Sequence, residues 1–258
     1  MRKVLAALDN SLAGNPVLAA GTALAELLGT DFEAVHVEVD GDRTARNAAA
    51  SAGVALRILA GPVVERLVEA AEPDDVAAFV IGARGTPGGR LPLGGTALSV
   101  ATALLKPVVV VPPDALVPKT FRRVLVPLEG TLSTSLAPRS IVALAGKIEV
   151  IALHVHEEDS IPGFTDQPQH EHAEWAQEFL ARWCPSGIGT VKLESRVGRS
   201  DVLIPNVADQ CGCDLIALGW SQDLAPGRAP VVRAALERSR VPVVLVPVVA
   251  ASAASVAA

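Results

Sequence analysis

The sequence Pro-Val-Val-Val-Val-Pro at 107–112 returns near the end of the chain as Pro-Val-Val-Leu-Val-Pro at 242–247. An unbroken aliphatic run between prolines is typical of a short strand that is buried on both faces of a parallel sheet. A second stretch repeats in the same order, because Val-Leu-Ala-Ala-Leu-Asp at 4–9 is echoed by Val-Leu-Val-Pro-Leu-Glu at 124–129. A period of roughly 120 to 135 residues indicates a duplicated domain and not a solenoid of short repeats.

The two copies are expected to form domains at 1–113 and 120–247, joined by a segment at 112–119 that contains three prolines. In each copy, short apolar runs alternate with stretches in which apolar residues recur at helical spacing. We expect strands at 4–8, 34–39, 55–59, 77–81, 108–111, 124–128, 149–154, 191–197, 215–218 and 243–246. We expect helices at 16–28, 43–52, 63–71, 95–105, 170–183 and 201–210, the last kinked or shortened by Pro205. This alternation predicts the α/β fold class, with two tandem five-stranded doubly wound domains, each with a parallel sheet.

The composition restricts the classes of function. Of the 258 residues, 50% are hydrophobic and 3% aromatic, and 22 basic against 28 acidic side chains give a net charge of −6. Such a chain lacks the positive field and the stacking platforms of nucleic-acid binders, so no nucleic-acid partner is expected. No apolar run reaches the roughly 18 residues of a membrane span and no signal peptide opens the sequence, so we expect a cytoplasmic protein without a membrane partner.

The glycine-rich stretch at 82–96 follows one expected strand and leads into an expected helix. It has the spacing Gly-x2-Gly-x9-Gly-Thr, at Gly82, Gly85, Gly95 and Thr96. Glycines let main-chain N–H groups approach a phosphate closely, and a helix start supplies unpaired N–H donors. The spacing differs from those of the P-loop and the Rossmann fingerprint. A glycine turn that only caps the helix is the alternative interpretation.

With these residues the chain resembles the universal stress protein superfamily, in the tandem form with two domains in one polypeptide. The resemblance covers about residues 1–247 and rests on the glycine spacing, on Asp9 after the first strand, on the His-Val pair at 36–37 and on the run at 107–112. It implies the strand order 3-2-1-4-5 in each domain and a ligand site at the switch point between the first and fourth strands. Pairing of the last strands would cover both exposed edges and make the chain an intrachain pseudo-dimer, while a homodimer of the whole chain also stays plausible.

The resemblance also assigns contacts to a bound nucleotide. Asp9 would approach the ribose and the adenine, and the main chain of Val37 would meet the adenine edge. Gly82, Arg84 and Gly85 would surround the α- and β-phosphates. These assignments suit the residue types, because a carboxylate accepts hydrogen bonds from ribose hydroxyls and a guanidinium can pair with a phosphate through two bonds. A solvated loop arginine is the alternative for Arg84.

The outer phosphates would be held by Gly95, Thr96 and Ala97 at the helix start. The ligand that the resemblance implies is ATP, together with Mg²⁺. No metal site built by the protein itself is expected.

The second copy departs from this pattern. Gly219 is retained, but Trp220 follows it, Pro-Val at 230–231 stands where Gly-Thr would be, and Glu129 replaces the aspartate. Proline has no N–H to offer a phosphate. We therefore expect the second domain to bind ATP poorly or not at all, and to serve as a structural partner of the first.

Histidines and cysteines form the remaining candidate clusters. His154 and His156, His170 and His172, and the Cys-x-Cys at 211–213 are of types that bind metals, but no second cysteine pair with structural-zinc spacing exists. Solvated histidines, and buried or loop thiols at the start of a strand, are the favoured interpretation.

Together these features predict a cytoplasmic stress-response protein that binds ATP in its first domain and acts through binding and conformation. Two alternatives stay open: a slow ATPase or nucleotidyl-transfer enzyme, and an interaction scaffold that binds no nucleotide. The loop at 82–96 contains arginines but no Asp, Glu, Lys or His that could activate a water molecule. Binding without catalysis is therefore favoured, and no catalytic residue is assigned.

Overall fold

The computed structural model describes residues 2–11, 13–39, 41–84, 93–128, 147–156, 177–182, 191–225 and 228–248. The first half contains β1 (Lys3–Leu8), α1 (Gly14–Leu28), β2 (Asp31–Glu38), α2 (Arg43–Ala52), β3 (Ala55–Ala60), α3 (Val63–Ala71), β4 (Val76–Gly82), α4 (Gly95–Ala103) and β5 (Val108–Val111). The second half contains β6 (Arg123–Pro127), β7 (Glu149–His156), β8 (Val191–Val197), α8 (Ser200–Gln210), β9 (Leu215–Trp220), α9 (Pro230–Arg238) and β10 (Val243–Pro247). Residues 177–182 are helical, while the rest of the expected helix at 170–183 lies outside the described residues.

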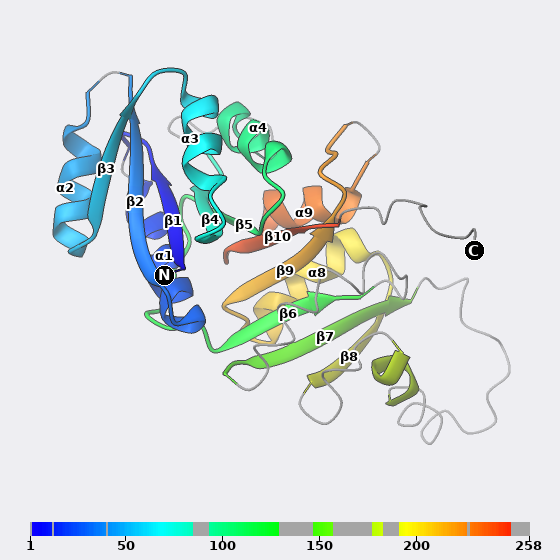
Figure 1. Ribbon diagram of the computed structural model, residues 1–258. Helices are drawn as coiled ribbons and strands as arrows, with labels where there is room; N and C mark the ends of the chain where they lie inside the picture. Colours follow the sequence, from blue (N-terminus) through cyan, green and yellow to red (C-terminus); the bar gives the residue numbers. More distant parts are fainter. Residues whose placement is uncertain are drawn as a thin grey trace, which may run out of the picture.

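The ten strands of the described residues join one sheet, in the order β3-β2-β1-β4-β5-β10-β9-β6-β7-β8. Each half therefore has the predicted order 3-2-1-4-5, and the expected doubly wound fold is confirmed. Every neighbouring pair is parallel except β5 and β10, which run antiparallel with Val109 opposite Val244. The predicted pairing of the two last strands is thus confirmed, and it joins the halves into a pseudo-dimer (Figure 1).

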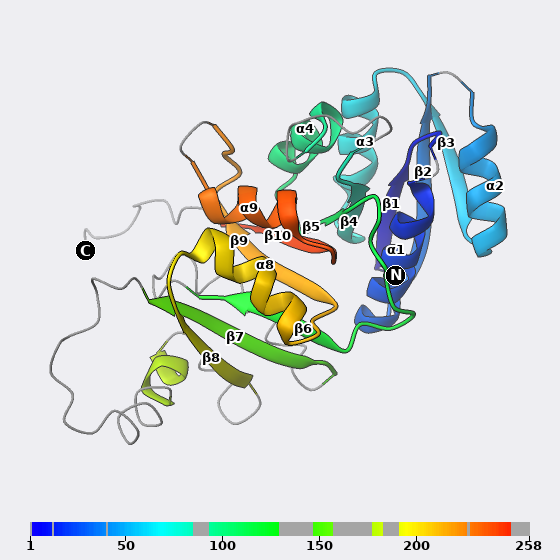
Figure 2. The ribbon, with the colours of Figure 1, turned by 180° about the vertical axis from the view of Figure 1, so that it is seen from behind.

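Alternate residues of each strand enter two different hydrophobic layers. Val4, Ala6 and Leu8 of β1 pack in one layer with α1 and α2, whereas Leu5 and Ala7 pack in the other with α3 and α4. Both layers continue into the second half, where α8 and α9 belong to the layer of α3 and α4. Figures 1 and 2 show α3 and α4 on one face of the first half and α1 on the opposite face. Burial on both faces explains why the strands are apolar runs and not alternating ones.

Two helices can be compared with what was expected of their carboxyl-terminal parts. α4 ends at Ala103 and not at 105, because its C-cap Leu104 is extended (φ −87°, ψ 127°). α8 continues to Gln210 although it contains Pro205, so this proline does not end the helix. Pro205 is itself buried beside Ile204, and packing of that face offsets the missing hydrogen bond.

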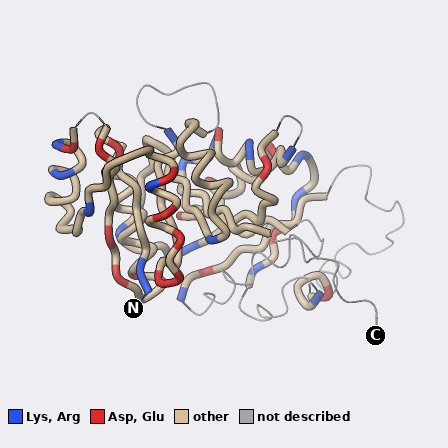
Figure 3. Tube along the Cα trace, turned by 45° about the horizontal axis from the view of Figure 1, so that its top comes forward, with Lys and Arg blue, Asp and Glu red and all other residues tan. Residues whose placement is uncertain are grey.

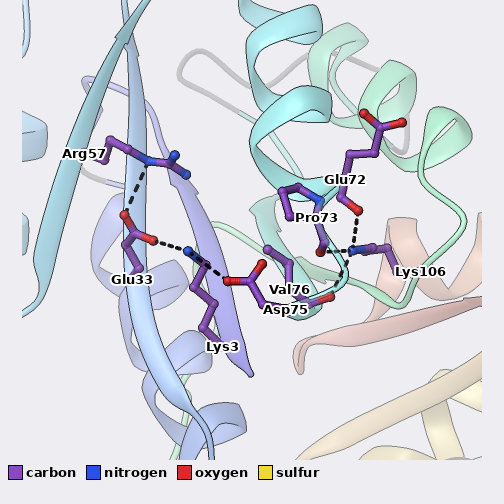
Figure 4. A network of polar contacts seen from close by, with 8 residues as sticks. All are labelled: Lys3, Glu33, Arg57, Glu72, Pro73, Asp75, Val76 and Lys106. Carbon is purple, nitrogen blue, oxygen red and sulfur yellow. Dashed lines mark hydrogen bonds and ion pairs between the residues drawn. The ribbon is translucent and has the colours of Figure 1, made fainter. Parts of the chain in front are cut away.

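Carboxylates tie the first three strands of each half together at the amino-terminal edge of the sheet. Glu33 on β2 lies 2.9 Å from Nζ of Lys3 on β1 and 3.3 Å from Nε of Arg57 on β3 (Figure 4). Glu149 on β7 bridges β8 and β6 in the same way, and hydrogen bonds from Lys192 and then Arg123 lower the pKa of its carboxyl. The duplication thus extends to polar contacts that the repeat pattern alone does not specify.

Lys106 makes further polar contacts at the same edge of the sheet in the first half. Its Nζ donates to the main-chain oxygens of Glu72, Pro73 and Val76 at 3.0, 2.7 and 3.0 Å, as Figure 4 shows. Glu72 is the C-cap of α3, so one ammonium group satisfies carbonyls between the end of this helix and the start of β4. Burial lowers the pKa of Lys106.

The halves also touch beside the connector at 112–119. Thr120 Oγ1 donates to the Glu26 carboxylate at 3.1 Å, and Lys147 Nζ donates to the main-chain oxygen of Leu27 at 3.1 Å. Phe121 is buried in the layer that contains α1.

In the described trace, acidic and basic residues are interspersed along both halves (Figure 3). None of the described helices is both long enough and apolar enough to span a lipid bilayer.

Candidate functional site

A cavity of about 690 Å³ opens at the carboxyl ends of β1, β2 and β4. β1 lies between β2 and β4 in the sheet. The strands β2 and β3 are therefore added on one side of β1, and β4 and β5 on the other. This is the switch point at which open α/β sheets bind ligands. The volume is within the roughly 300 to 1,000 Å³ of small-molecule sites.

Seven of the eight residues predicted to contact a nucleotide line this one cavity. They are Asp9, Val37, Gly82, Arg84, Gly95, Thr96 and Ala97. Gly85 lies outside the described residues. The structure therefore brings together positions from three strand ends and one helix start that are up to 88 residues apart in the sequence, Asp9 and Ala97 being the extremes.

The loop after β1 is held by its own short polar side chains. Asp9 Oδ1 accepts hydrogen bonds from the Ser11 N–H at 3.1 Å and from Ser11 Oγ at 2.5 Å. Asn10 Oδ1 accepts the N–H of Thr44 at 2.8 Å, which joins this loop to the first turn of α2. Such Asx contacts fix a turn without secondary structure. The exposed Asp9 keeps its second carboxylate oxygen for a ligand.

His36 is the buried polar group beneath the cavity, with 3% of its surface exposed. Its Nδ1 lies 2.8 Å from the Leu8 oxygen, and its Nε2 lies 3.1 Å from the Gly41 oxygen. The ring thus joins the end of β1 to the loop after β2. A neutral imidazole donates through one nitrogen only, so it can serve one of these carbonyls at a time. Because both ring nitrogens face main-chain oxygens, His36 positions the walls of the cavity.

The start of α4 leaves its donors open to the cavity. Gly94 donates its N–H to the Ala83 oxygen at 2.8 Å, and no side chain caps the helix. The next N–H groups, beginning with Gly95, point along the helix axis without an intrahelical acceptor. A Cβ placed on Gly95 would meet no atom within 4 Å. The open space is therefore in front of the helix start, where a ligand can reach the main chain.

Arg84 adds a cation to the same side. Its Nε atom is buried and has no hydrogen-bond partner among the described residues. A buried N–H without an acceptor is costly, and an anionic group of a ligand would satisfy it. Helix donors and a guanidinium at one end of the cavity, with a carboxylate on the loop after β1, fit a ligand that carries phosphate and hydroxyl groups.

Sequence reasoning missed the apolar walls. Val17 of α1, Val63 and Leu67 of α3, and Leu93 before α4 also line the cavity. Val63 and Leu67 are four residues apart on one helix face, a spacing that predicts core packing and does not distinguish a residue at the rim of a cavity. That these side chains line the cavity follows from the sheet topology and not from their local sequence.

The second half has a different arrangement at the corresponding place. Trp220, the residue after Gly219, is 3% exposed and packs in the layer of α8 and α9. Its indole is drawn into the core because β9 continues through it, next to Pro247 of β10. Pro230 is the first residue of α9 and offers no N–H. Glu129 lies outside the described residues.

No group of three or more potential metal ligands is present in the described ranges. His170, His172 and Cys184 fall outside these ranges. Cys211 and Cys213 are free thiols, and burial raises the pKa of the Cys213 thiol to about 12.

Comparisons with known proteins agree with this fold. A protein of unknown function from Pseudomonas aeruginosa PAO1 matches with a TM-score of 0.67 and 13% identity, over 96% of this chain and 92% of that chain. A putative universal stress protein from Pseudomonas aeruginosa UCBPP-PA14 matches with a TM-score of 0.62 and 14% identity, over 95% and 91%. A universal stress protein from Archaeoglobus fulgidus matches with a TM-score of 0.60 and 17% identity, over 93% and 97%.

These likenesses cover both halves and show a shared fold. A search of the curated proteins gives no match. The model of the universal stress protein family matches residues 120–247, which comprise β6 to β10. The chain therefore belongs to the universal stress protein family through residues 120–247, and it carries the fold of that family twice.

Proposed function

We propose that this protein is a cytoplasmic stress-response protein that binds ATP in its first domain, residues 1–113. The observation that carries the proposal is the single cavity around which the seven described residues of the predicted set gather. Its apolar walls suit an adenine ring, Asp9 suits ribose hydroxyls, and the start of α4 with Arg84 suits phosphates.

The residues present fit the nucleotide better than they fit a protein-held metal. Gly95 leaves room for a phosphate at the helix start, and the buried Nε of Arg84 needs an acceptor. Asp9 is the one carboxylate in the described lining of the cavity, and Ser11 already occupies its Oδ1. Mg²⁺ would therefore arrive bound to the phosphates and not to a preformed carboxylate cage.

Binding is favoured over hydrolysis because no free carboxylate or imidazole in the described lining lies at the proposed phosphate end: the open oxygen of Asp9 is on the loop after β1, where the ribose is proposed to bind. Both ring nitrogens of His36 face main-chain oxygens, and Asp9 Oδ1 accepts from Ser11. A general base needs a free acceptor within reach of the attacking water.

The second domain, residues 120–247, is proposed to act as a structural partner without a phosphate site, because Pro230 removes a donor at its helix start.

Calorimetric titration with Mg-ATP tests the proposal. Gly95→Val is expected to abolish binding, because its side chain would fill the space in front of the helix start, while the free energy of unfolding changes little. Ser200→Val, at the first residue of α8 and outside the cavity lining, is the matched control and should bind as the wild type does.

Two results would contradict the proposal. Neither heat nor a thermal shift at millimolar Mg-ATP would favour the nucleotide-free scaffold. Phosphate release above about 1 s⁻¹ would favour an enzyme, because typical turnover numbers begin near that value.

A further inference from the structure

We infer that Gln222, a residue of the second half, positions the phosphate end of the candidate site in the first half. This inference rests on the proposed function. Gln222 follows β9, the fourth strand of its half, and so corresponds in the repeat to the loop that follows β4 and carries Arg84. In the second half this loop contacts the opposite half.

The contact is made at the carboxyl end of α4. Nε2 of Gln222 donates to the main-chain oxygens of Thr102 at 2.9 Å and of Leu104 at 2.8 Å. Carbonyls at the end of a helix have no partner inside it, and a side-chain amide from outside can satisfy them. Figures 1 and 2 both show the segment after β9 rising beside α4.

The loop is braced so that it can hold this position. Gln222 has a left-handed backbone (φ 59°), which is unfavourable for a residue with a side chain. Arg233 of α9 donates from one guanidinium nitrogen to the main-chain oxygens of Leu224 and Ala225, and Asp223 Oδ1 accepts the Ala225 N–H at 2.8 Å. The amide is therefore presented by a loop that α9 fixes.

α4 transmits the restraint to the cavity. The helix has nine residues, so its ends lie only about 13 Å apart at 1.5 Å per residue. Gly95, Thr96 and Ala97 at its start line the cavity, while Thr102 and Leu104 at its end are held by Gln222. A helix this short moves as one rigid body, so a displacement of its carboxyl end also displaces its start. Holding its carboxyl end thus restricts the movement of the N–H groups that would meet the phosphates.

The experiment compares two ligands on the full chain. Gln222→Gly removes the amide and keeps a residue that adopts φ 59° without strain. We expect its Kd for Mg-ATP to rise about three- to tenfold, the range for one or two neutral hydrogen bonds, and its Kd for adenosine to stay as in the wild type. Amides of α4 should exchange faster with solvent in this variant.

Two further variants sharpen the test. Gln222→Lys should restore ATP affinity, because Lys106 of the same chain shows an ammonium group satisfying carbonyls at the end of a helix. Gln210→Gly, at the last residue of α8, is the matched control and should leave both affinities unchanged.

The outcomes are distinguishable. A wild-type chain that binds no ATP overturns the proposed function and this inference with it. A wild-type chain that binds ATP, with Gln222→Gly binding it equally well, overturns this inference alone. Equal weakening for ATP and adenosine also overturns it, because a general loss of structure does not discriminate between the two ligands.

Discussion

Cys213 lies just before β9 and has 5% of its surface exposed. Burial is the main cause that raises the pKa of its thiol from 9.0 to about 12, with the neighbouring Cys211 adding to it. The folded chain therefore keeps this proton over a pH range in which the unfolded chain loses it. Because the unfolded state then binds fewer protons than the folded state, stability must fall as the pH rises.

We expect the free energy of unfolding to fall between pH 9 and pH 12 by up to about 1.4 kcal/mol per pH unit from this group alone. Urea unfolding at pH 8, 9.5 and 10.5 measures the slope. Cys213→Ala should flatten the slope, whereas Cys211→Ala should keep it. Equal slopes in the wild type and in Cys213→Ala would show that the buried thiol does not cause the alkaline loss.

Most residues of the candidate site could be predicted singly. Gly82, Gly95 and Thr96 are recognisable from spacing, because a phosphate loop needs main-chain access at set intervals. Gln222 could not be predicted, because its partners are 118 and 120 residues away and its side chain matches no motif. Such a contact depends on the packing of two folded halves and leaves no local pattern.

Among the elements, α3 and β4 depend on a single cation from the segment before β5. Lys106 uses all three of its N–H donors on main-chain oxygens between the end of α3 and the start of β4. No other side chain is recorded as a donor to these three oxygens within the described residues. Removal of the ammonium group takes this donor from all three oxygens, of which the Val76 contact is part-buried, while the Pro73 oxygen keeps the Val76 N–H at 2.9 Å.

Lys106→Met should therefore lower the free energy of unfolding by about 1 to 3 kcal/mol, the range for losing hydrogen bonds made by a charged donor. Lys147→Met is the matched control, because Lys147 donates to one main-chain oxygen, that of Leu27, and a smaller loss is expected. Chemical denaturation of both variants at pH 7 makes the comparison. An equal or larger loss for Lys147→Met would contradict this role of Lys106.

The elements themselves were largely predictable from periodicity. The expected strand at 108–111 and the helices at 43–52 and 63–71 coincide with β5, α2 and α3. β2 begins three residues earlier than expected, at Asp31, because the start of the strand is polar and its pairing with β1 does not require apolar side chains. Boundaries of this kind are set by neighbours in the sheet.

The whole molecule is expected to unfold as one cooperative unit, because the sheet and both hydrophobic layers are continuous between the halves. All three tryptophans, at 175, 183 and 220, are in the second half. Tryptophan fluorescence therefore reports that half, and far-ultraviolet circular dichroism reports both. The two thermal transitions should coincide.

Ligand binding makes the test stronger. Mg-ATP at 100 times its Kd should stabilise the native chain by about 2.7 kcal/mol, and tryptophan fluorescence should show the shift although the ligand binds in the other half. A fluorescence midpoint that stays constant while the dichroism midpoint rises would show that the halves unfold independently.

The antiparallel contact between β5 and β10 is made within one polypeptide, so its partner is always present. A covalent connector gives this contact an effective concentration that does not fall on dilution, unlike an association between separate chains. In this contact each half meets its sibling and not a copy of itself. A residue such as Gln222 can thus contact the opposite half without an equivalent residue having to make the same contact in the reverse direction. The two halves are therefore free to specialise.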